Sequence, residues 1–367
     1  MTPGIAAPLT LLDKIRRQIL SNGPISIADY MAQCLGDPKF GYYMTKDPFG
    51  TAGDFITAPE ISQMFGELVG GWCVETWKQL SKPSKFNLIE IGPGRGTLMS
   101  DLLRIAALDS EFHAAASIHL IETSPLLKRH QQETLENAKL AVSWHESMAS
   151  ISDAPTILIA NELLDALPIR QFMFTDSLWR ERVVGVGQDQ KLAFGLGAAT
   201  LDPKSLPNHC HQIDEGTTVE ISTAVTNLVE DISRTLLRNG GACLLIDYGY
   251  TRFTTGDTLQ AVKTHKPTGI LDEPGEADLT AHVNFDAVKR AAKLSGVYHH
   301  GPLEQGTFLL NLGLLERAGQ LGSDKDRKTQ EQIRADVERL AAPDQMGNLF
   351  KVFAMSSEAL NLPGFQN

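Results

Sequence analysis

The sequence predicts an α/β fold of the doubly wound class, in which helices cover both faces of a mostly parallel sheet. Two observations carry this prediction. Short apolar runs alternate with stretches of helical periodicity over residues 85–160, which implies parallel strands joined by right-handed crossovers. A glycine-rich turn also follows the first apolar run directly, as it does where a strand leads a nucleotide-like ligand to the start of a helix.

The N-terminal part of the chain is predicted to be helical. Apolar residues recur at helical spacing over 11–20 and over 27–35, where Ser26 is a candidate N-cap. A loop punctuated by Gly and Pro follows at 53–60, and a third helix is predicted over 61–80. We therefore expect a helical cap ahead of the sheet.

The alternation that follows predicts the first part of the sheet. Strands are expected over 85–91, 117–122, 141–145 and 155–160, and helices over 97–108 and 125–137. After residue 168, short alternating stretches are typical of antiparallel strands inserted on the ligand side of the sheet, at 170–174, 181–186 and 191–196. We expect this insertion to form a substrate lid.

The rest of the chain returns to the sheet. A long amphipathic helix is predicted over 218–238 and a buried strand over 242–246. Residues 251–282 are rich in Gly, Thr, Asp and Pro and predict a long loop with a short strand at 259–263; loops of this length are usually functional. Helices near 284–295, 307–319 and 327–341 and a strand over 349–355 complete the prediction.

These elements predict four segments. We expect a helical cap with a covering loop, a first part of the core, an inserted lid, and a second part of the core that contains the 251–282 loop, at 1–82, 83–168, 169–216 and 217–367 respectively.

Composition excludes several classes of protein. A hydrophobic content of 42% and a charged content of 21% are ordinary for a globular protein, so disorder is not indicated. The formal charge of −11 argues against a nucleic-acid scaffold and favours a basic or neutral partner. The four cysteines form no C-x-x-C pair, so we expect no metal site and a reducing compartment. Neither a targeting segment nor a membrane span is indicated, which predicts a cytoplasmic protein.

The glycine turn is the first candidate for chemistry. Its spacing after Glu90 is E-x-G-x-G-x-G, with Gly92, Gly94 and Gly96, whereas a dinucleotide fingerprint needs G-x-G-x-x-G. Thr97 stands where that third glycine would be, which disfavours a pyrophosphate. The spacing instead favours the turn of S-adenosylmethionine (SAM) methyltransferases, in which backbone and acid hold the amino-acid end of a cofactor that has no phosphate.

Glu122 is the second candidate. It ends the second predicted strand, where a carboxylate can accept hydrogen bonds from both hydroxyls of a ribose. The alternative is an exposed, solvated charge. Paired with the glycine turn, the ribose interpretation is favoured, and because NAD also carries a ribose, the glycine spacing is what separates SAM from NAD.

The third candidate is the segment 161–168, where the fourth strand would meet the ligand crevice. Asn161 is placed to contact the cofactor, and Glu162 and Asp165 lie three residues apart, so in a helical turn both carboxylates would project from one side and hold one cation. Alternatively, Asn161 caps a following helix that has the two acids in its first turn. A guanidinium would suit such a pair, because carboxylates bind it bidentately and fix which nitrogen faces the methyl donor.

Five further residues have two open interpretations each. Asp54, Thr57 and Glu60 either cap the next helix or close over SAM. Asp247 either faces the acceptor or only ends a strand. His282 lies in a polar loop, where a histidine is either structural or catalytic.

Five motifs together resemble the MidA family of SAM-dependent methyltransferases, related to the mitochondrial arginine methyltransferase that assists assembly of respiratory complex I. They are GDFITAPEIS at 53–62, EIGPGRGT at 90–97, NELLDALP at 161–168, IDYG at 246–249 and LTAHVN at 279–284. The resemblance implies a class I methyltransferase fold with a seven-stranded sheet, SAM as methyl donor and, for the mitochondrial members, a protein arginine as acceptor. Glu162 and His282 are similar in type and position to the paired acids and the Thr-His pair of other arginine methyltransferases, although here Ala281 separates Thr280 from His282.

Three functions follow as hypotheses. The leading one is protein arginine N-methylation linked to respiratory complex assembly, with a respiratory complex subunit as the possible partner. A small-molecule methyltransferase, with 170–200 enclosing a metabolite, is the second. The third is an assembly factor that binds SAM without catalysis.

Overall fold

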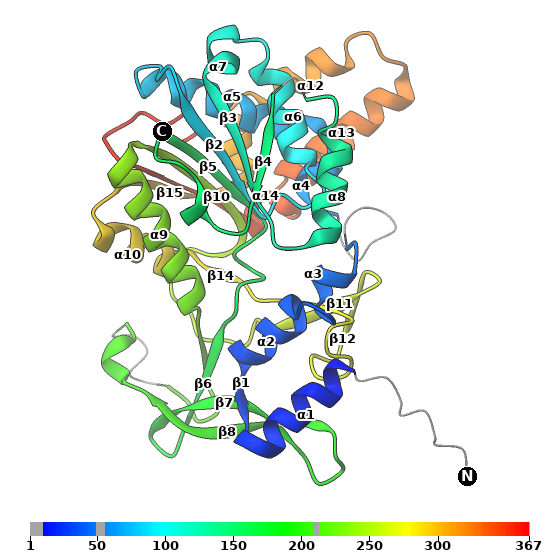
Figure 1. Cartoon of the computed structure of the whole chain (residues 1–367), viewed down its shortest axis with the longest axis vertical. Coiled ribbons are helices and arrows are strands. Elements are labelled where there is room, and N and C mark those ends of the chain that lie inside the picture. The colour runs from blue at the N-terminus through cyan, green and yellow to red at the C-terminus, as the bar shows by residue number, and fades with distance from the viewer. Residues whose placement is uncertain (1–9, 49–55, 139, 208–212, 367) are drawn as a thin grey trace. The chain divides into compact units, whose positions relative to one another are not determined.

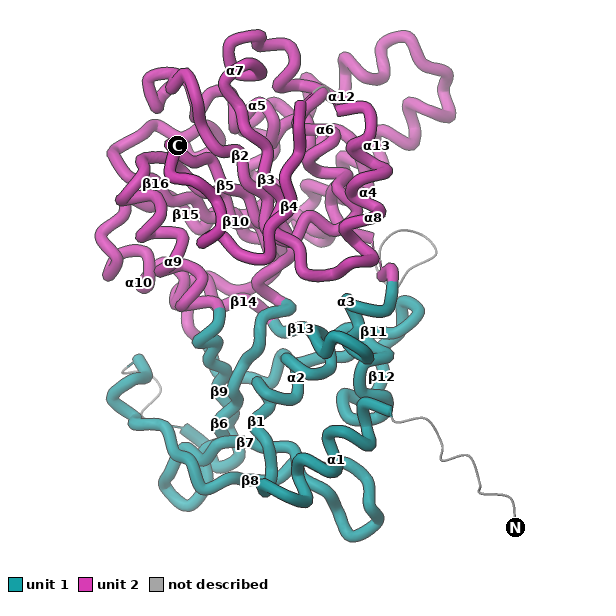
Figure 2. The backbone as a smooth tube through the Cα atoms, viewed as in Figure 1, with its two compact units in different colours: residues 1–46, 166–224, 254–281 teal, residues 47–165, 225–253, 282–367 magenta. Residues whose placement is uncertain are grey.

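The computed structural model describes residues 10–48, 56–138, 140–207 and 213–366 (Figure 1). The chain forms two compact units, each made from three separate stretches of sequence (Figure 2). Unit 1 comprises residues 1–46, 166–224 and 254–281, and unit 2 comprises 47–165, 225–253 and 282–367. Every sequence-predicted site residue belongs to a stretch of unit 2.

Unit 2 contains the main sheet, with the strand order β15-β16-β10-β5-β2-β3-β4. Its strands are β2 (Phe86–Ile91), β3 (Ala116–Ile121), β4 (Val142–His145), β5 (Thr156–Asn161), β10 (Gly241–Tyr250), β15 (Tyr298–Glu304) and β16 (Phe350–Ser356). β4, β3, β2, β5 and β10 are parallel, and β16 runs antiparallel to both of its neighbours. A two-residue strand, β14 (Val283–Asn284), pairs with the end of β10. The predicted doubly wound, mostly parallel sheet is confirmed.

The order of the strands identifies a ligand crevice. β3 lies on one side of β2 and β5 on the other, so the strand order reverses at β2. In open α/β sheets, ligands bind beyond the carboxyl ends of the strands at such a reversal. The residues that follow β2, β3 and β5 are those that the sequence singled out.

Helices cover both faces of this sheet. Figure 1 shows α5 (Gln63–Gln79), α6 (Thr97–Ala106) and α8 (Pro125–Thr134) on one side and α9 (Thr223–Asn239) and α10 (Phe285–Ser295) on the other. β2 and β5 are buried along their whole length, which explains their continuous apolar character. On the α5 side, the rings of Trp77, Phe86 and Phe112 pack with centroids 4.9–6.3 Å apart. The other helices of unit 2 in the described residues are α4 (Ala58–Ile61), α7 (Ser110–Ala115), α11 (Gln305–Asn311), α12 (Leu314–Gly322), α13 (Arg327–Ala341) and α14 (Met346–Leu349).

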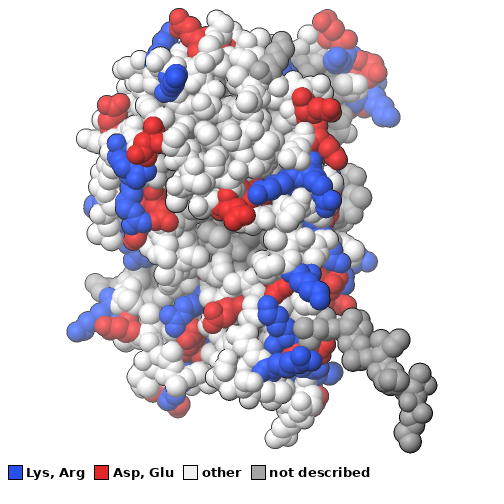
Figure 3. Space-filling view, in the orientation of Figure 1, with Lys and Arg blue, Asp and Glu red and all other residues white. Residues whose placement is uncertain are grey.

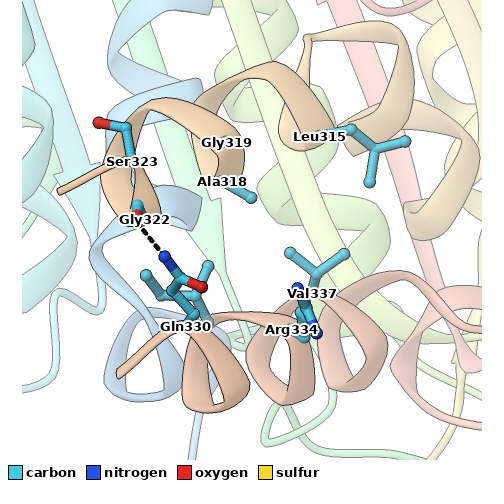
Figure 4. A pocket seen from close by; sticks show the side chains of 9 residues that line it. Leu315, Ala318, Gly319, Gly322, Ser323, Gln330, Arg334 and Val337 are labelled. Atoms are coloured by element: carbon cyan, nitrogen blue, oxygen red, sulfur yellow. Dashed lines mark hydrogen bonds between the residues drawn. The ribbon is translucent and has the colours of Figure 1, made fainter. Parts of the chain in front are cut away.

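α12 and α13 enclose a cavity of about 350 Å³ (Figure 4). Its walls are mostly apolar or small side chains, and Gln330 donates from Nε2 to the Gly322 carbonyl, 3.0 Å away, at one end. α12 is tied to α5 by Arg317, whose Nε lies 2.7 Å from the buried carboxylate of Glu67. None of the predicted site residues lines this cavity.

Unit 1 combines helices with two small sheets. Its helices are α1 (Leu11–Asn22), α2 (Ile27–Gly36) and α3 (Tyr42–Thr45). Ser26 accepts the Asp29 N–H at 3.0 Å, so its predicted N-cap role is confirmed. The first sheet joins β1 (Ile25–Ser26), β6 (Arg170–Thr175), β7 (Leu178–Val186), β8 (Leu192–Leu201) and β9 (Thr218–Ile221), and the second joins β11 (Gln260–Lys263), β12 (Lys266–Thr268) and β13 (Asp278–Thr280). The predicted antiparallel strands after residue 168 are confirmed.

Two predicted helices differ from the structure. The helix predicted over 218–238 begins only at Thr223, because residues 218–221 form β9 and pair with β6. The helix predicted over 307–319 is broken at Gly313, whose φ of 90° ends α11 and starts α12. β15 was not predicted. The boundary between the two units falls between residues 46 and 47, inside the predicted 1–82 segment. The predicted segment 169–216 lies within unit 1, and its role as a substrate lid stays a prediction.

Charges are mixed over the surface. On the face drawn in Figure 3, acidic and basic side chains are interspersed among the described residues. No helix in the described stretches has both the length and the apolar character needed to cross a membrane.

Candidate functional site

The glycine turn follows β2 in a conformation that glycine favours. Gly92, Gly94 and Gly96 have φ values of 66°, 53° and 83°, all in the left-handed region. A Cβ on Gly92 would lie 2.8 Å from the Leu163 side chain, so a larger residue does not fit there without a shift. The Gly96 position begins α6. The turn therefore presents its own backbone and a helix N-terminus at the carboxyl end of β2.

Two buried oxygen atoms beside this turn have no hydrogen-bond partner. Among the described residues, neither Oε2 of Glu90 nor Oδ1 of Asn161 has a donor. Glu90 is only 3% exposed, and burial raises the pKa of its carboxyl to about 8. Unsatisfied buried acceptors are uncommon and costly, so the pair indicates that a donor is supplied by a ligand.

Both residues line one small cavity. Thr57, Gly92, Gly94 and Glu162 line it too, and its volume is about 40 Å³. This space holds a group about the size of one water molecule or an ammonium. An ammonium supplies N–H donors and a positive charge, and the amino-acid end of SAM carries such a group. These two acceptor oxygens therefore fit the ammonium end of the cofactor.

Glu122 is connected to the glycine turn through hydrogen bonds of Gln131. Glu122 is 9% exposed, which excludes the solvated-charge alternative. Its Oε1 accepts the Ser124 N–H at 2.7 Å, and its Oε2 accepts from Gln131 Nε2 at 3.0 Å. The same Gln131 nitrogen donates to the Gly94 carbonyl at 2.8 Å. Burial raises the pKa of Glu122, and these hydrogen bonds oppose the shift.

The sequence interpretation missed Gln131, although a signal for it exists. Leu127, Gln131 and Leu135 follow one another at a spacing of four residues, and all three are buried. A polar residue at a position where the helix otherwise buries leucines needs a buried partner.

The turn after β5 is not a helix, so the alternative in which Asn161 caps one is wrong, and the helical turn assumed for Glu162 and Asp165 does not form. Glu162 has a φ of 52°, which costs a residue other than glycine about 1 kcal/mol or more and is most common at functional sites. Its Oε1 accepts from the Ala58 N–H at 2.9 Å and from Asn161 Nδ2 at 3.2 Å. Burial, together with the charge of Asp165, raises the pKa of Glu162 to about 7.

Asp247 holds this turn through the backbone. Its Oδ2 accepts the N–H groups of Leu163, Leu164 and Asp165, at 3.1, 2.7 and 3.3 Å. Its Oδ1 accepts the N–H of Tyr248 at 2.9 Å. Asp247 is fully buried, and burial together with the charges of Asp165 and Glu162 raises its pKa well above the usual range. The structure thus places Asp247 under the turn that carries both predicted acids.

The remaining candidates are placed less directly. The ring of His282 meets that of Tyr248 edge to face, with centroids 5.3 Å apart, and burial with the charge of Lys351 lowers its pKa. Its part in chemistry stays a prediction. In the described structure, the Thr57 side chain makes no capping bond to α4, so it lines the cavity instead of capping. Asp54 lies outside the described residues.

Two contacts connect the covering segment to the glycine turn, and neither was predicted. Thr97 donates to Glu60 at 2.5 Å, and Arg95 forms a two-bond pair with Asp47 at 3.1 and 2.7 Å. Within the described stretches, no group of three or more His, Cys, Asp or Glu side chains is arranged to hold a metal ion.

Comparison with known proteins gives consistent matches. Residues 68–303 match a family described as "Putative S-adenosyl-L-methionine-dependent methyltransferase". The chain is 37% identical to the mitochondrial protein arginine methyltransferase NDUFAF7 homolog of Drosophila melanogaster, over 94% of this chain and 84% of that protein. It is 34% identical to the human protein arginine methyltransferase NDUFAF7, over 95% of this chain and 84% of that protein.

A solved structure is similar over nearly the whole chain. It is a protein from Burkholderia thailandensis with bound S-adenosyl-homocysteine, and the TM-score is 0.84 at 27% identity. The match covers 97% of this chain and 92% of that one.

Proposed function

The chain belongs to this family of S-adenosyl-L-methionine-dependent methyltransferases, and on that premise we propose that it methylates an arginine side chain of a protein substrate. Its cofactor is SAM, which supplies a methyl group on a positively charged sulfur. The observation that carries the arginine proposal is the pair of acids after β5: Glu162, which lines the cavity and accepts the Ala58 N–H, and the buried Asp165.

We assign the cofactor-binding roles as follows. Glu90 and Asn161 hold the ammonium group, which supplies the donors that their buried oxygens lack. The backbone of the glycine turn faces the carboxylate, and Glu122 accepts from the ribose hydroxyls. We propose that Thr57, which lines the cavity, and Asp54 also contact the cofactor.

The acceptor roles fall to Glu162 and Asp165. Two carboxylates bind the planar fork of a guanidinium and leave one nitrogen directed at the methyl group. A guanidinium that gains a methyl carbon through nitrogen must release one proton. Glu162, whose pKa of about 7 keeps it ionised in slightly alkaline solution, is the base placed to accept it. We propose His282, whose ring contacts Tyr248 near the end of β10, as a further catalytic residue.

The relatives support the same acceptor and suggest the partner. Those at 34–37% identity are mitochondrial protein arginine methyltransferases. The family resemblance extends to complex I assembly, so we propose a subunit of a respiratory complex as the methylated protein.

The test uses the purified protein, SAM with a labelled methyl group, and an extract of cells that lack the gene. We expect mass spectrometry to find methylated arginine, and Glu162→Gln to reduce its formation by about a hundredfold or more. Glu331→Gln, an exposed site on α13, is the matched control and should leave the rate unchanged. Label found only in small molecules would support a metabolite methyltransferase instead. No transfer by a protein that binds SAM would contradict catalysis and favour the assembly-factor alternative.

A further inference from the structure

One side chain connects the two ends of the proposed cofactor site. Gln131 is fully buried, and its Nε2 donates both to Glu122 and to the Gly94 carbonyl, at 3.0 and 2.8 Å. The stem of Gln131 also packs on the turn, because a Cβ on Gly96 would lie 3.4 Å from its Cα. The glycine turn after β2 and the acid after β3 are therefore held by the same residue of α8.

The orientation of the Gln131 amide is determined by Trp144. The indole Nε1 of Trp144, on β4, lies 2.9 Å from Gln131 Oε1. An indole N–H can only donate, so the amide oxygen must face Trp144 and the amide nitrogen must face Glu122. Glu122 consequently accepts at Oε2, while its Oε1 accepts from Ser124. The arrangement requires an acceptor at both Glu122 oxygens.

We propose that Gln131, oriented by Trp144, is a positioning residue for the cofactor. It sets the distance between the Glu122 carboxylate and the glycine turn. Glu122 can then contact the ribose while the turn contacts the amino-acid end of the same cofactor molecule. This inference rests on the cofactor role that we propose for Glu122.

The chemistry of the amide explains why glutamine is needed. Leucine has a similar size but no donor, so both Glu122 Oε2 and the Gly94 carbonyl would lose a buried bond. A carboxyl at this place would lie about 3 Å from the Glu122 carboxylate, and two acids so close share one proton. At low pH that shared proton restores one donor, whereas at high pH the two charges repel.

The test is calorimetric binding of S-adenosyl-homocysteine to the full chain at pH 6 and pH 8. We expect Gln131→Leu to weaken binding about tenfold or more at both pH values, since bonds to a charged group are lost. Gln131→Glu should weaken binding more at pH 8 than at pH 6. Trp144→Phe keeps an aromatic side chain but removes the indole N–H, and it leaves both bonds from the Gln131 amide nitrogen possible, so it should weaken binding by a smaller factor than Gln131→Leu.

Gln132→Leu and Gln132→Glu are the matched controls, because Gln132 is the next residue and is exposed. The unchanged protein measured at both pH values accounts for the other groups beside Glu122, which are Lys128, whose charge acts on Glu122, and His145, whose carbonyl accepts the Glu122 N–H. If Gln131 had only a structural role, Gln131→Glu would weaken S-adenosyl-homocysteine binding equally at both pH values. This result would overturn the proposal. Should Gln131→Leu fail to fold, Gln131→Glu and Trp144→Phe decide the matter.

The two proposals fail in different ways. If the unchanged protein binds S-adenosyl-homocysteine and Glu122→Ala does not weaken that binding, the proposed cofactor role of Glu122 is wrong. The inference about Gln131 is then wrong as well. If Glu122→Ala weakens binding and the Gln131 variants do not, only the inference about Gln131 is wrong.

Discussion

Glu162→Gln should make the free protein more stable, by an amount that depends on pH. The pKa of Glu162 is raised from 4.5 to about 7, mainly because burial opposes its charge. At 1.4 kcal/mol per pKa unit, this shift corresponds to about 3 kcal/mol. An acid whose pKa is raised by folding contributes its full stability below pH 4.5, and this contribution is lost as the pH rises through about 7. Glutamine has no proton to lose, and its Oε1 can still accept from Ala58 and Asn161.

The variant should therefore match the unchanged protein near pH 4.5 and exceed its free energy of unfolding by about 3 kcal/mol at pH 8. Between those values the difference should grow with pH. Urea unfolding followed by tryptophan fluorescence measures this, because Trp72, Trp77 and Trp144 all lie in unit 2. Glu331→Gln, at an exposed site, should show no such trend. A difference between Glu162→Gln and the unchanged protein that stays constant across the pH range would refute the reasoning.

Three further predictions concern other parts of unit 2. Asp247→Ala removes the acceptor of four backbone N–H groups and should lower the free energy of unfolding by about 3 kcal/mol, which urea titration measures. S-adenosyl-homocysteine binding at pH 7 should release about one proton, because the ligand's ammonium converts Glu90, with its pKa of about 8, to a carboxylate; calorimetry in buffers of different ionisation heat detects it, and Glu90→Gln should abolish it. Arg317→Ala leaves Glu67 with one cation fewer and should cost about 2 kcal/mol in thermal unfolding, whereas Arg327→Ala, at an exposed ion pair, should cost under about 1 kcal/mol.

Much of the main sheet could be predicted from the sequence, because its strands are buried on both faces and are therefore continuous apolar runs. α13 was predicted over its whole length, 327–341, by its period alone. β9 was not, since residues 218–221 precede a strongly amphipathic helix and only the partner strand β6 shows that they are extended. Local periodicity carries no information about a partner distant in sequence.

The candidate site shows the same division. Glu90, the glycines and Glu122 could be singled out because each follows an apolar run. The arrangement after β5 could not, since Glu162 adopts a left-handed backbone conformation that propensity disfavours and that the buried Asp247, 85 residues later in the chain, holds in place. The bonds of Gln131 likewise depend on three groups from three different segments.

The place of β16 in the sheet has a consequence for how the protein is made. β16 comprises residues 350–356, yet it lies between β10 and β15 and not at an edge. During synthesis, β15 leaves the ribosome with no neighbour in this sheet, and one side of β10 stays open until residue 356 has emerged. Completing the sheet must therefore wait until residue 356 has emerged, and such long-range pairing is slow and exposes unpaired strand edges meanwhile. A nascent chain arrested before residue 350 should accordingly depend on chaperones more than one arrested well past residue 356.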